Sequence, residues 1–311
     1  MKRELPNRKF RKLVPKLREK GFYKSKEKRE ISWAEYNSAQ INEASELMHK
    51  IKELVNLCAL IPSKSVGRPL TNPNELAKAI LVVELLGLPE RQSQGWLEIL
   101  SPFLGIASKL DDRTIGRAYS RLEVLKILKE VFEITKTSDG CLMGDGTGLE
   151  TSRKQNYEAT KKKTENYLTS IIDSREIVQS FEMNNKECPI MHSLIKEVKG
   201  DSLRLDAGFI DKELTRKLGE LGIKPFIFPR KNINLNGNIY WKTMFLDLYY
   251  ETQQWLKEYH QRSHCESFHS SFKRKNRIFM KVGSFSKLIQ LTARIIIHNL
   301  RKQNYYSRLK G

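Results

Sequence analysis

The sequence lacks the features of a membrane-spanning or secreted protein. The longest apolar run, from Ala79 to Leu88, is interrupted by Glu84. A transmembrane helix needs about 20 consecutive apolar residues, so none is expected. The N-terminal segment is basic, and no apolar signal sequence follows it. The 4 cysteines are scattered and form no CxxC pair, which is typical of reduced thiols and predicts a cytoplasmic protein.

Acidic residues are scarce at both ends of the chain. The 311 residues include 56 Lys and Arg against 36 Asp and Glu, for a net charge of +20. Residues 1–30 carry 13 basic and 4 acidic side chains, residues 262–311 carry 12 basic side chains and 1 acidic one, and the segment between them is neutral. Basic ends favour a polyanionic partner, because each neutralised phosphate releases counterions. Nucleic acid fits this pattern best; the alternatives are solvated charge and an anionic membrane surface.

Three parts of the chain differ in their patterning. Residues 1–33 predict a basic arm with short helical pieces. Residues 34–134 predict an all-helical domain, with one amphipathic helix over about 33–60 and a second from about Pro73 to Gly87, where a left-handed cap is expected. Residues 135–311 alternate strands with helices and end in basic helices, which predicts an α/β domain with a mixed sheet. Its strands include a hairpin that turns at Ser174 and Arg175.

The helical domain contains a candidate DNA-reading element. A helix is predicted from about Asp112, and Arg113, Arg117 and Arg121 follow one another at intervals of four along it. This pattern suits a helix-turn-helix that reads DNA. A solvated basic edge on a packing helix explains the pattern equally well.

Two aspartates of the α/β domain come at the ends of predicted buried strands. Asp145 stands in the segment MGDGTG and Asp206 in RLDAGF. Carboxylates at the carboxyl ends of such strands face the crevice where α/β sheets bind ligands. Each signal is weak alone, because Asp at a strand end is also common in turns.

A sharper pattern is Tyr259-x2-Arg262-x3-Glu266-x6-Lys273. A helix is predicted from about Trp255 to Lys275, and on it these four side chains fall within a sector of about 60°. Arg262 and Lys273 suit phosphate oxygens. Asp145, Asp206 and Glu266 follow one another at intervals of 61 and 60 residues. Carboxylates are hard ligands for Mg²⁺ or Mn²⁺, and two such ions can promote phosphoryl transfer on DNA.

The pattern resembles a known family. Tyr-x2-Arg-x3-Glu-x6-Lys is similar, at full spacing, to the signature of the YREK group of insertion-sequence transposases, which are DDE enzymes with an RNase H-like core. Asp145-Gly146-Thr147 resembles the first-acid motif of that family, and Asp206-Ala207-Gly208-Phe209 resembles the second. The resemblance covers roughly residues 67–303, whereas residues 1–60 match nothing. The 60 residues between Asp206 and Glu266 leave little room for a large insertion, so a compact core is expected.

The resemblance implies a function. Asp145, Asp206 and Glu266 would be the catalytic triad and would hold two divalent cations, Mg²⁺ or Mn²⁺. Tyr259, Arg262 and Lys273 would contact double-stranded DNA at the ends of the mobile element. The implied reaction frees a 3′-hydroxyl by hydrolysis and then joins it to target DNA, with the protein acting as a homodimer or larger assembly and with no membrane partner.

Other interpretations stay open. The nearby His260, His264, Cys265 and His269 could form a structural zinc site. The chain could be a decayed or domesticated DNA-binding protein without catalysis, or a metal-dependent nuclease on the same fold. Lys161, Lys162 and Lys163 lie in a polar loop after the first acid and could grip DNA near the site, or could be solvated.

Overall fold

The chain folds into two compact units, each built from several segments. The computed structural model describes residues 5–19, 21–24, 31–59, 71–150, 165–183, 187–276 and 278–309. Unit 1 comprises residues 1–30, 137–149 and 166–274, and unit 2 comprises residues 31–136, 150–165 and 275–311. The sequence placed everything after residue 135 in one domain, whereas the contacts group the last helix with the helical segment before residue 137.

Unit 1 is centred on a five-stranded mixed sheet with the order β3-β2-β1-β4-β5. β4 lies between β1 and β5 and is parallel to both, whereas β2 and β3 are antiparallel. The strands are β1 (Cys141–Glu150), β2 (Glu165–Ile172), β3 (Val178–Met183), β4 (Ser202–Leu205) and β5 (Lys224–Ile227). The predicted hairpin is confirmed as β2 and β3, and the mixed α/β sheet is confirmed.

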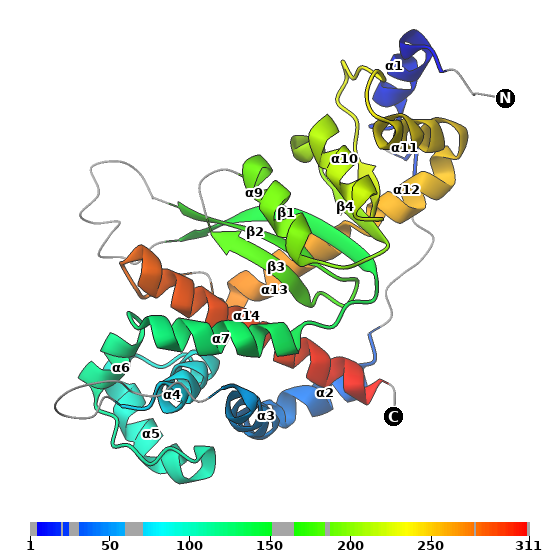
Figure 1. Ribbon diagram of the computed structural model, residues 1–311. Helices are drawn as coiled ribbons and strands as arrows, with labels where there is room; N and C mark the ends of the chain where they lie inside the picture. The colour runs from blue at the N-terminus through cyan, green and yellow to red at the C-terminus, as the bar shows by residue number, and fades with distance from the viewer. Residues whose placement is uncertain are drawn as a thin grey trace. The chain divides into compact units, whose positions relative to one another are not determined.

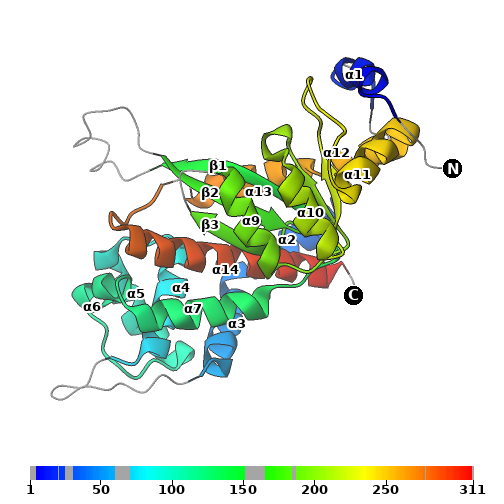
Figure 2. The ribbon, with the colours of Figure 1, turned by 45° about the horizontal axis from the view of Figure 1, so that its top comes forward.

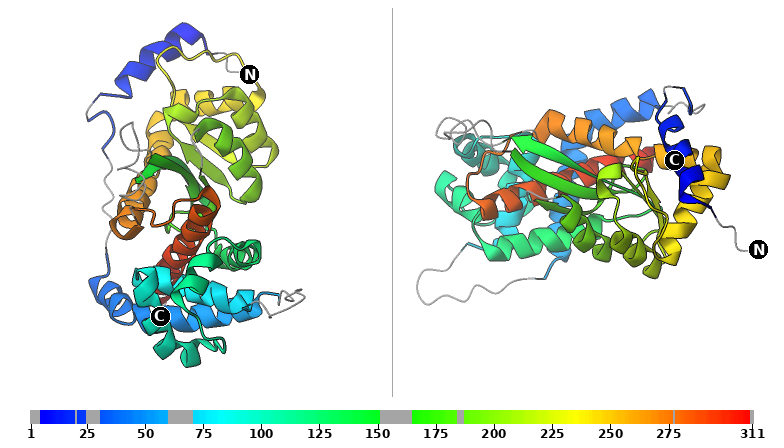
Figure 3. Two further views of the ribbon diagram at one scale, coloured as in Figure 1. Left: turned by 90° about the vertical axis from the view of Figure 1, so that its left-hand side faces the viewer. Right: turned by 90° about the horizontal axis from the view of Figure 1, so that it is seen from above.

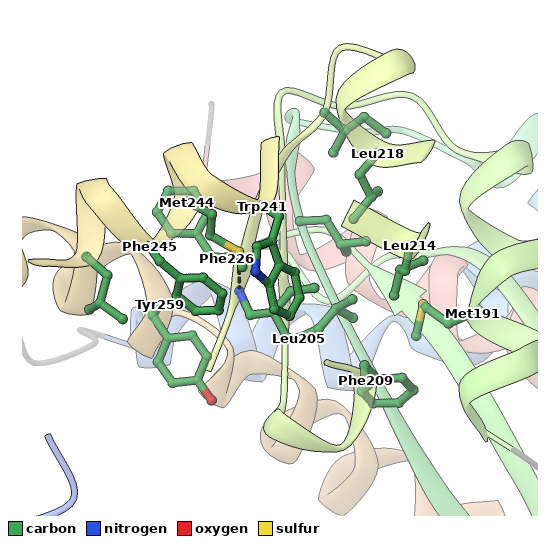
Figure 4. Close-up of a cluster of buried hydrophobic side chains, with 14 of the residues drawn as sticks. Met191, Leu205, Phe209, Leu214, Leu218, Phe226, Trp241, Met244, Phe245 and Tyr259 are labelled. Carbon is green, nitrogen blue, oxygen red and sulfur yellow. Dashed lines mark hydrogen bonds between the residues drawn. The ribbon is translucent and has the colours of Figure 1, made fainter. Parts of the chain in front are cut away.

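Helices cover both faces of this sheet. Figures 1 and 2 show α9 (Glu187–Leu194) and α10 (Lys212–Glu220) on one face and α13 (Ser263–Asn276) on the other. α11 (Ile239–Tyr250) and α12 (Thr252–His260) follow β5. Buried side chains of α9, α10, α11 and α12 join those of β1, β2, β4 and β5 in one hydrophobic cluster. Within it, the Ile227 N–H donates to Met244 Sδ at 3.4 Å (Figure 4).

No element was predicted over the segment that forms α11. Its sequence is rich in aromatic residues, which favour strands more than helices. The helix begins at Asn238, whose side-chain oxygen accepts from the Trp241 N–H at 2.9 Å. Trp241 and Phe245 then bury one side of the helix in the cluster. Tertiary packing and the N-cap therefore stabilise a helix that the local sequence does not favour.

The N-terminal arm contains a helix, α1 (Asn7–Lys16), that packs onto unit 1. The Phe10 ring lies 5.2 Å from the Phe245 ring of α11, and both side chains are fully buried. Figure 3 shows α1, in blue, beside α11 and α12. A small apolar face thus anchors the arm to unit 1. The basic composition of the arm did not indicate this face.

Unit 2 is helical and includes the C-terminal helix. α4 is apolar on almost every side and is buried from Pro73 to Val83 apart from Glu75. It begins at the predicted proline and ends at Gly87, whose φ of 65° confirms the predicted left-handed cap. The helices of unit 2 are α2 (Trp33–Ile41), α3 (Glu43–Leu57), α4 (Pro73–Leu86), α5 (Glu90–Leu104), α6 (Asp112–Ala118), α7 (Leu122–Thr135) and α14 (Ser284–Arg308). In the described part of the chain, no helix has the length and apolar character needed to cross a membrane.

Two predicted helices of unit 2 are each divided. The helix expected over 33–60 breaks at Asn42 into α2 and α3. The helix expected from Asp112 breaks after Ala118 into α6 and α7, and its N-cap is Asp111, whose carboxylate accepts from the Thr114 N–H. Arg121 falls at the break and donates to the Thr71 carbonyl oxygen at 2.8 Å. The three arginines therefore do not line one helix.

Candidate active site

The two aspartates lie side by side at one edge of the sheet. In the parallel pairing of β1 with β4, Gly144 is opposite Leu205, so the next residues along are Asp145 and Asp206. Paired residues of neighbouring strands point to the same face. The sequence placed Asp145 at a strand end, but β1 continues to Glu150, and only Asp206 follows its strand directly. The residue before Asp145, Gly144, packs closely, since a Cβ there would lie 2.6 Å from a Leu205 methyl carbon and 2.9 Å from the Met191 methyl carbon.

Arg262 joins the third acid to the first. Its Nη2 donates to Glu266 Oε1 at 2.9 Å, and its Nη1 donates to Asp145 Oδ2 at 3.1 Å. Glu266 is exposed, whereas Asp145 and Arg262 are half-buried. One guanidinium therefore pairs with two of the three predicted acids.

The helix predicted over 255–275 is not continuous, so the single-helix argument for the four signature residues was wrong. α12 ends at His260 and α13 begins at Ser263, which leaves Arg262 in the turn. The turn is closed by bonds between residues three apart, such as Arg262 N–H to the Tyr259 oxygen at 3.0 Å. The break lets Arg262 reach Asp145 while Glu266 and Lys273 stay on α13.

The charges around Asp145 shift its pKa. Burial raises the pKa of the Asp145 carboxyl above its ordinary value, and the negative charges of Asp206 and Glu266 raise it further. The Gly146 N–H and the Arg262 guanidinium act in the opposite direction. All three acids also raise the pKa of Arg262 against the effect of its burial. The three carboxylates and Arg262 thus form one electrostatic cluster.

Tyr259 lies at the edge of the hydrophobic cluster, next to this site (Figure 4). Its ring stacks on Trp255 with centroids 5.3 Å apart, and burial raises the pKa of its hydroxyl to about 12. Trp255 and Trp241 are both buried and act as packing residues. Lys273 is half-buried on α13.

Two arginines that the sequence did not single out support the site. Arg230 donates to the Ala207 oxygen at 3.0 Å and to the Gly208 oxygen at 3.1 Å, and so holds the turn directly after Asp206. The buried Arg204 donates to Glu258 Oε2 at 2.6 Å and to the Glu258 carbonyl oxygen at 2.9 Å, which ties β4 to the helix of Tyr259. Arg230 follows β5 at the same sheet edge as Asp206. Its position directly after a predicted strand is the sequence feature that could have identified it as a site residue.

The described residues contain no ready-made metal cage. Among the described residues, no three His, Cys, Asp or Glu side chains are grouped so that they could hold a metal ion, and this includes the three acids. The zinc alternative receives no support, since Cys265 is fully buried and His260 stacks on Tyr23 at 4.6 Å.

The other predicted DNA contacts lie outside the described part of unit 1. Lys161, Lys162 and Lys163 lie outside the described residues. Arg113 and Arg117 are exposed on α6 of unit 2, where both lower the pKa of Asp111 as minor contributors after its bonds to Thr114.

The buried His269 of α13 makes a prediction about pH. Burial first, and then the charges of Lys273 and Arg262, lower its pKa from 6.5 to about 4. Below pH 6.5 the unfolded chain takes up a proton that the folded protein does not, so stability is lost as the pH falls toward 4. Urea unfolding at pH 7.5 and at pH 5 should differ by about 2 kcal/mol more for the natural chain than for His269→Leu. An equal pH dependence in both would contradict this, and His49→Gln, an exposed histidine, is the control.

Fold and site together define an α/β protein with a carboxylate cluster at a sheet edge and basic ends. A comparison with protein families matches residues 137–300 to the family described as Transposase DDE domain. The match spans more than half of the chain and contains all three acids. The chain therefore belongs to the family of transposases with a DDE domain. None of the curated proteins compared with the chain matches it in sequence.

Proposed function

We propose that this transposase belongs to an insertion sequence of the YREK group, binds the ends of its own element, and catalyses metal-dependent cleavage and strand transfer on double-stranded DNA. It would act in the cytoplasm as a homodimer or larger assembly on paired ends. The observation that carries the proposal is the cluster of Asp145, Asp206 and Glu266 around Arg262. The strand order and the placing of the acids on β1, after β4 and on α13 support an RNase H-like core.

The donor chemistry of the site fits two divalent cations. Asp145 is a half-buried carboxylate with two further carboxylates nearby, and their repulsion is relieved by any added cation. Asp145, Asp206 and Glu266 would hold Mg²⁺ or Mn²⁺ through hard oxygen ligands. When bound, such ions activate a water or hydroxyl nucleophile and stabilise the leaving oxygen of a phosphodiester.

The basic side chains would bind and orient the DNA. Arg262 would exchange its carboxylate partners for phosphate oxygens, which its planar guanidinium can bind with two bonds. Lys273 would contribute a point charge and Tyr259 its hydroxyl, which stays protonated because of its raised pKa. Lys161, Lys162 and Lys163 would grip DNA near the site, and Arg113 and Arg117 would add DNA contacts from the helical domain.

The function can be tested with the DNA that flanks the gene as a labelled substrate. Purified protein should nick it at a defined position when Mn²⁺ or Mg²⁺ is present, and Glu266→Gln should not. Tight binding without cleavage under any metal would favour the DNA-binding alternative without catalysis. Metal-dependent cleavage without a defined position would favour a nuclease on the same fold.

Arg262 makes a prediction that needs no DNA. Its positive charge pairs with two of the three acids and therefore opposes a cation at the same carboxylates. Arg262→Gln is expected to raise the affinity for Mn²⁺ by about tenfold, measured by calorimetry on the DNA-free protein. Arg274→Gln removes an exposed charge from α13 and should leave the affinity unchanged. Unchanged or weaker Mn²⁺ binding in Arg262→Gln would contradict the competition.

A further inference from the structure

The docked helix α1 carries charge that its own stability does not explain. Arg8, Lys9, Lys12 and Lys16 fall within a sector of about 100° at the helical spacing, and all four side chains are exposed. The helix contains no acidic residue, and two of the cations stand in its first turn. Like charges on neighbouring turns repel each other, and cations are unfavourable at the N-terminus of a helix dipole.

The opposite face of α1 is already occupied. Phe10 and Val14 are fully buried, Leu17 is nearly so, and all three belong to the hydrophobic cluster of unit 1. Polar bonds add to this docking: Arg11 Nε donates to the Ile233 oxygen at 2.9 Å, and the Leu235 N–H donates to Asn7 Oδ1 at 2.8 Å. An interfacial membrane helix needs a free apolar face, so the basic face of α1 is left for a soluble polyanion.

The chain that follows α1 leads to the signature residues. Arg18 donates to the Pro229 oxygen at 3.1 Å and lies 5.2 Å from the centroid of the Phe228 ring. The Phe228 ring lies 5.2 Å from that of Tyr259. Tyr23 stacks on His260 with an interplanar angle of 6°. The helix is therefore fixed to the catalytic unit and connects by packed side chains to the end of α12.

We propose that α1 is a DNA-binding element of the catalytic unit, in which Arg8, Lys9, Lys12 and Lys16 contact the phosphate backbone of double-stranded DNA. This rests on the proposed function, because it assigns a further surface to the same substrate. The contacts read no base sequence; they hold the duplex against the unit that carries the acids. Residues 1–60 match no part of the family pattern described above. Their first helix, α1, would have the role of binding DNA.

The test measures binding to an end-bearing duplex and to a random duplex by fluorescence anisotropy between 50 and 300 mM salt. The variant Arg8→Gln/Lys9→Gln/Lys12→Gln/Lys16→Gln should lower the slope of log affinity against log salt by about 3–4 for both duplexes. Affinity at about 150 mM salt should fall at least about tenfold. The thermal midpoint should not fall, since none of the four side chains is buried.

Two controls separate the outcomes. Lys196→Gln/Lys199→Gln/Lys212→Gln removes exposed lysines elsewhere on unit 1 and should leave the slope within about one unit of the natural value. Lys9→Arg/Lys12→Arg/Lys16→Arg keeps the charge and should keep the slope. An unchanged slope in the glutamine variant, an equal loss in the Lys196 control, or binding to phosphatidylserine vesicles in place of DNA would overturn the proposal. If the natural chain does not cleave DNA but the glutamine variant shows the expected lower salt slope, the proposed function is contradicted. The assignment of α1 as a DNA-binding surface would still hold.

Discussion

Replacing Glu84 by leucine is expected to lower the free energy of unfolding by about 3–5 kcal/mol, because it leaves a buried arginine without its counterion. Glu84 lies on α4 and is 7% exposed, and its Oε2 accepts from Arg294 Nε of α14 at 2.7 Å. Its Oε1 accepts from the Tyr119 hydroxyl and from Gln290 Nε2, each at 2.7 Å. One carboxylate thus satisfies three buried donors from two other parts of unit 2.

Urea unfolding followed by far-UV circular dichroism and tryptophan fluorescence would measure this effect. Glu84→Gln keeps an acceptor and should cost less than Glu84→Leu. The double change Glu84→Leu/Arg294→Met removes both charges and should be more stable than Glu84→Leu alone. Glu133→Gln is the matched control in unit 2, since that carboxylate is 64% exposed in its pair with Lys136; it should cost less than about 1 kcal/mol. Equal losses for Glu84→Leu and Glu133→Gln would show that the buried network does not stabilise the unit.

The role of Glu84 shows what local patterning could not supply. In the sequence it is a single charge that interrupts an apolar run, and such a charge has no visible partner. Its partner Arg294 lies 210 residues further on, in a helix that the patterning assigned to the α/β domain. Periodicity predicts that a helix exists, but it carries no information about which distant helix packs against it.

The candidate site, too, could be predicted only in part from local sequence patterns. The apolar segments that contain Asp145 and precede Asp206 are bounded by turn residues and therefore predict strands. The structure confirms both strands. The register that places the two acids side by side depends on pairing between segments 61 residues apart. The break between α12 and α13 contains neither glycine nor proline, so nothing local marks it. Arg262, in this break, bonds to Asp145, a partner that only the folded sheet provides.

Asp145→Asn is expected to lower the rate of metal-dependent DNA cleavage by about 10³-fold or more, while the free energy of unfolding rises by up to about 1 kcal/mol. The carboxylate is expected to be lost as a metal ligand, because a neutral amide binds a divalent cation far more weakly. Stability rises because the raised pKa of Asp145 means that its charged form is costly in the folded protein. Asp206→Asn and Glu266→Gln should show losses of cleavage of the same order.

Single-turnover cleavage of an end-bearing duplex, with urea unfolding of the same preparations, measures both effects together. Asp201→Asn is the control, since this exposed carboxylate precedes the opposite end of β4; it should retain full cleavage. A loss of cleavage that comes with a gain in stability cannot arise from misfolding, so it would assign Asp145 to the chemistry. A loss of cleavage together with a lower free energy of unfolding would instead show that Asp145 has a structural role. Its bond to Arg262 would then be the interaction that stabilises the fold.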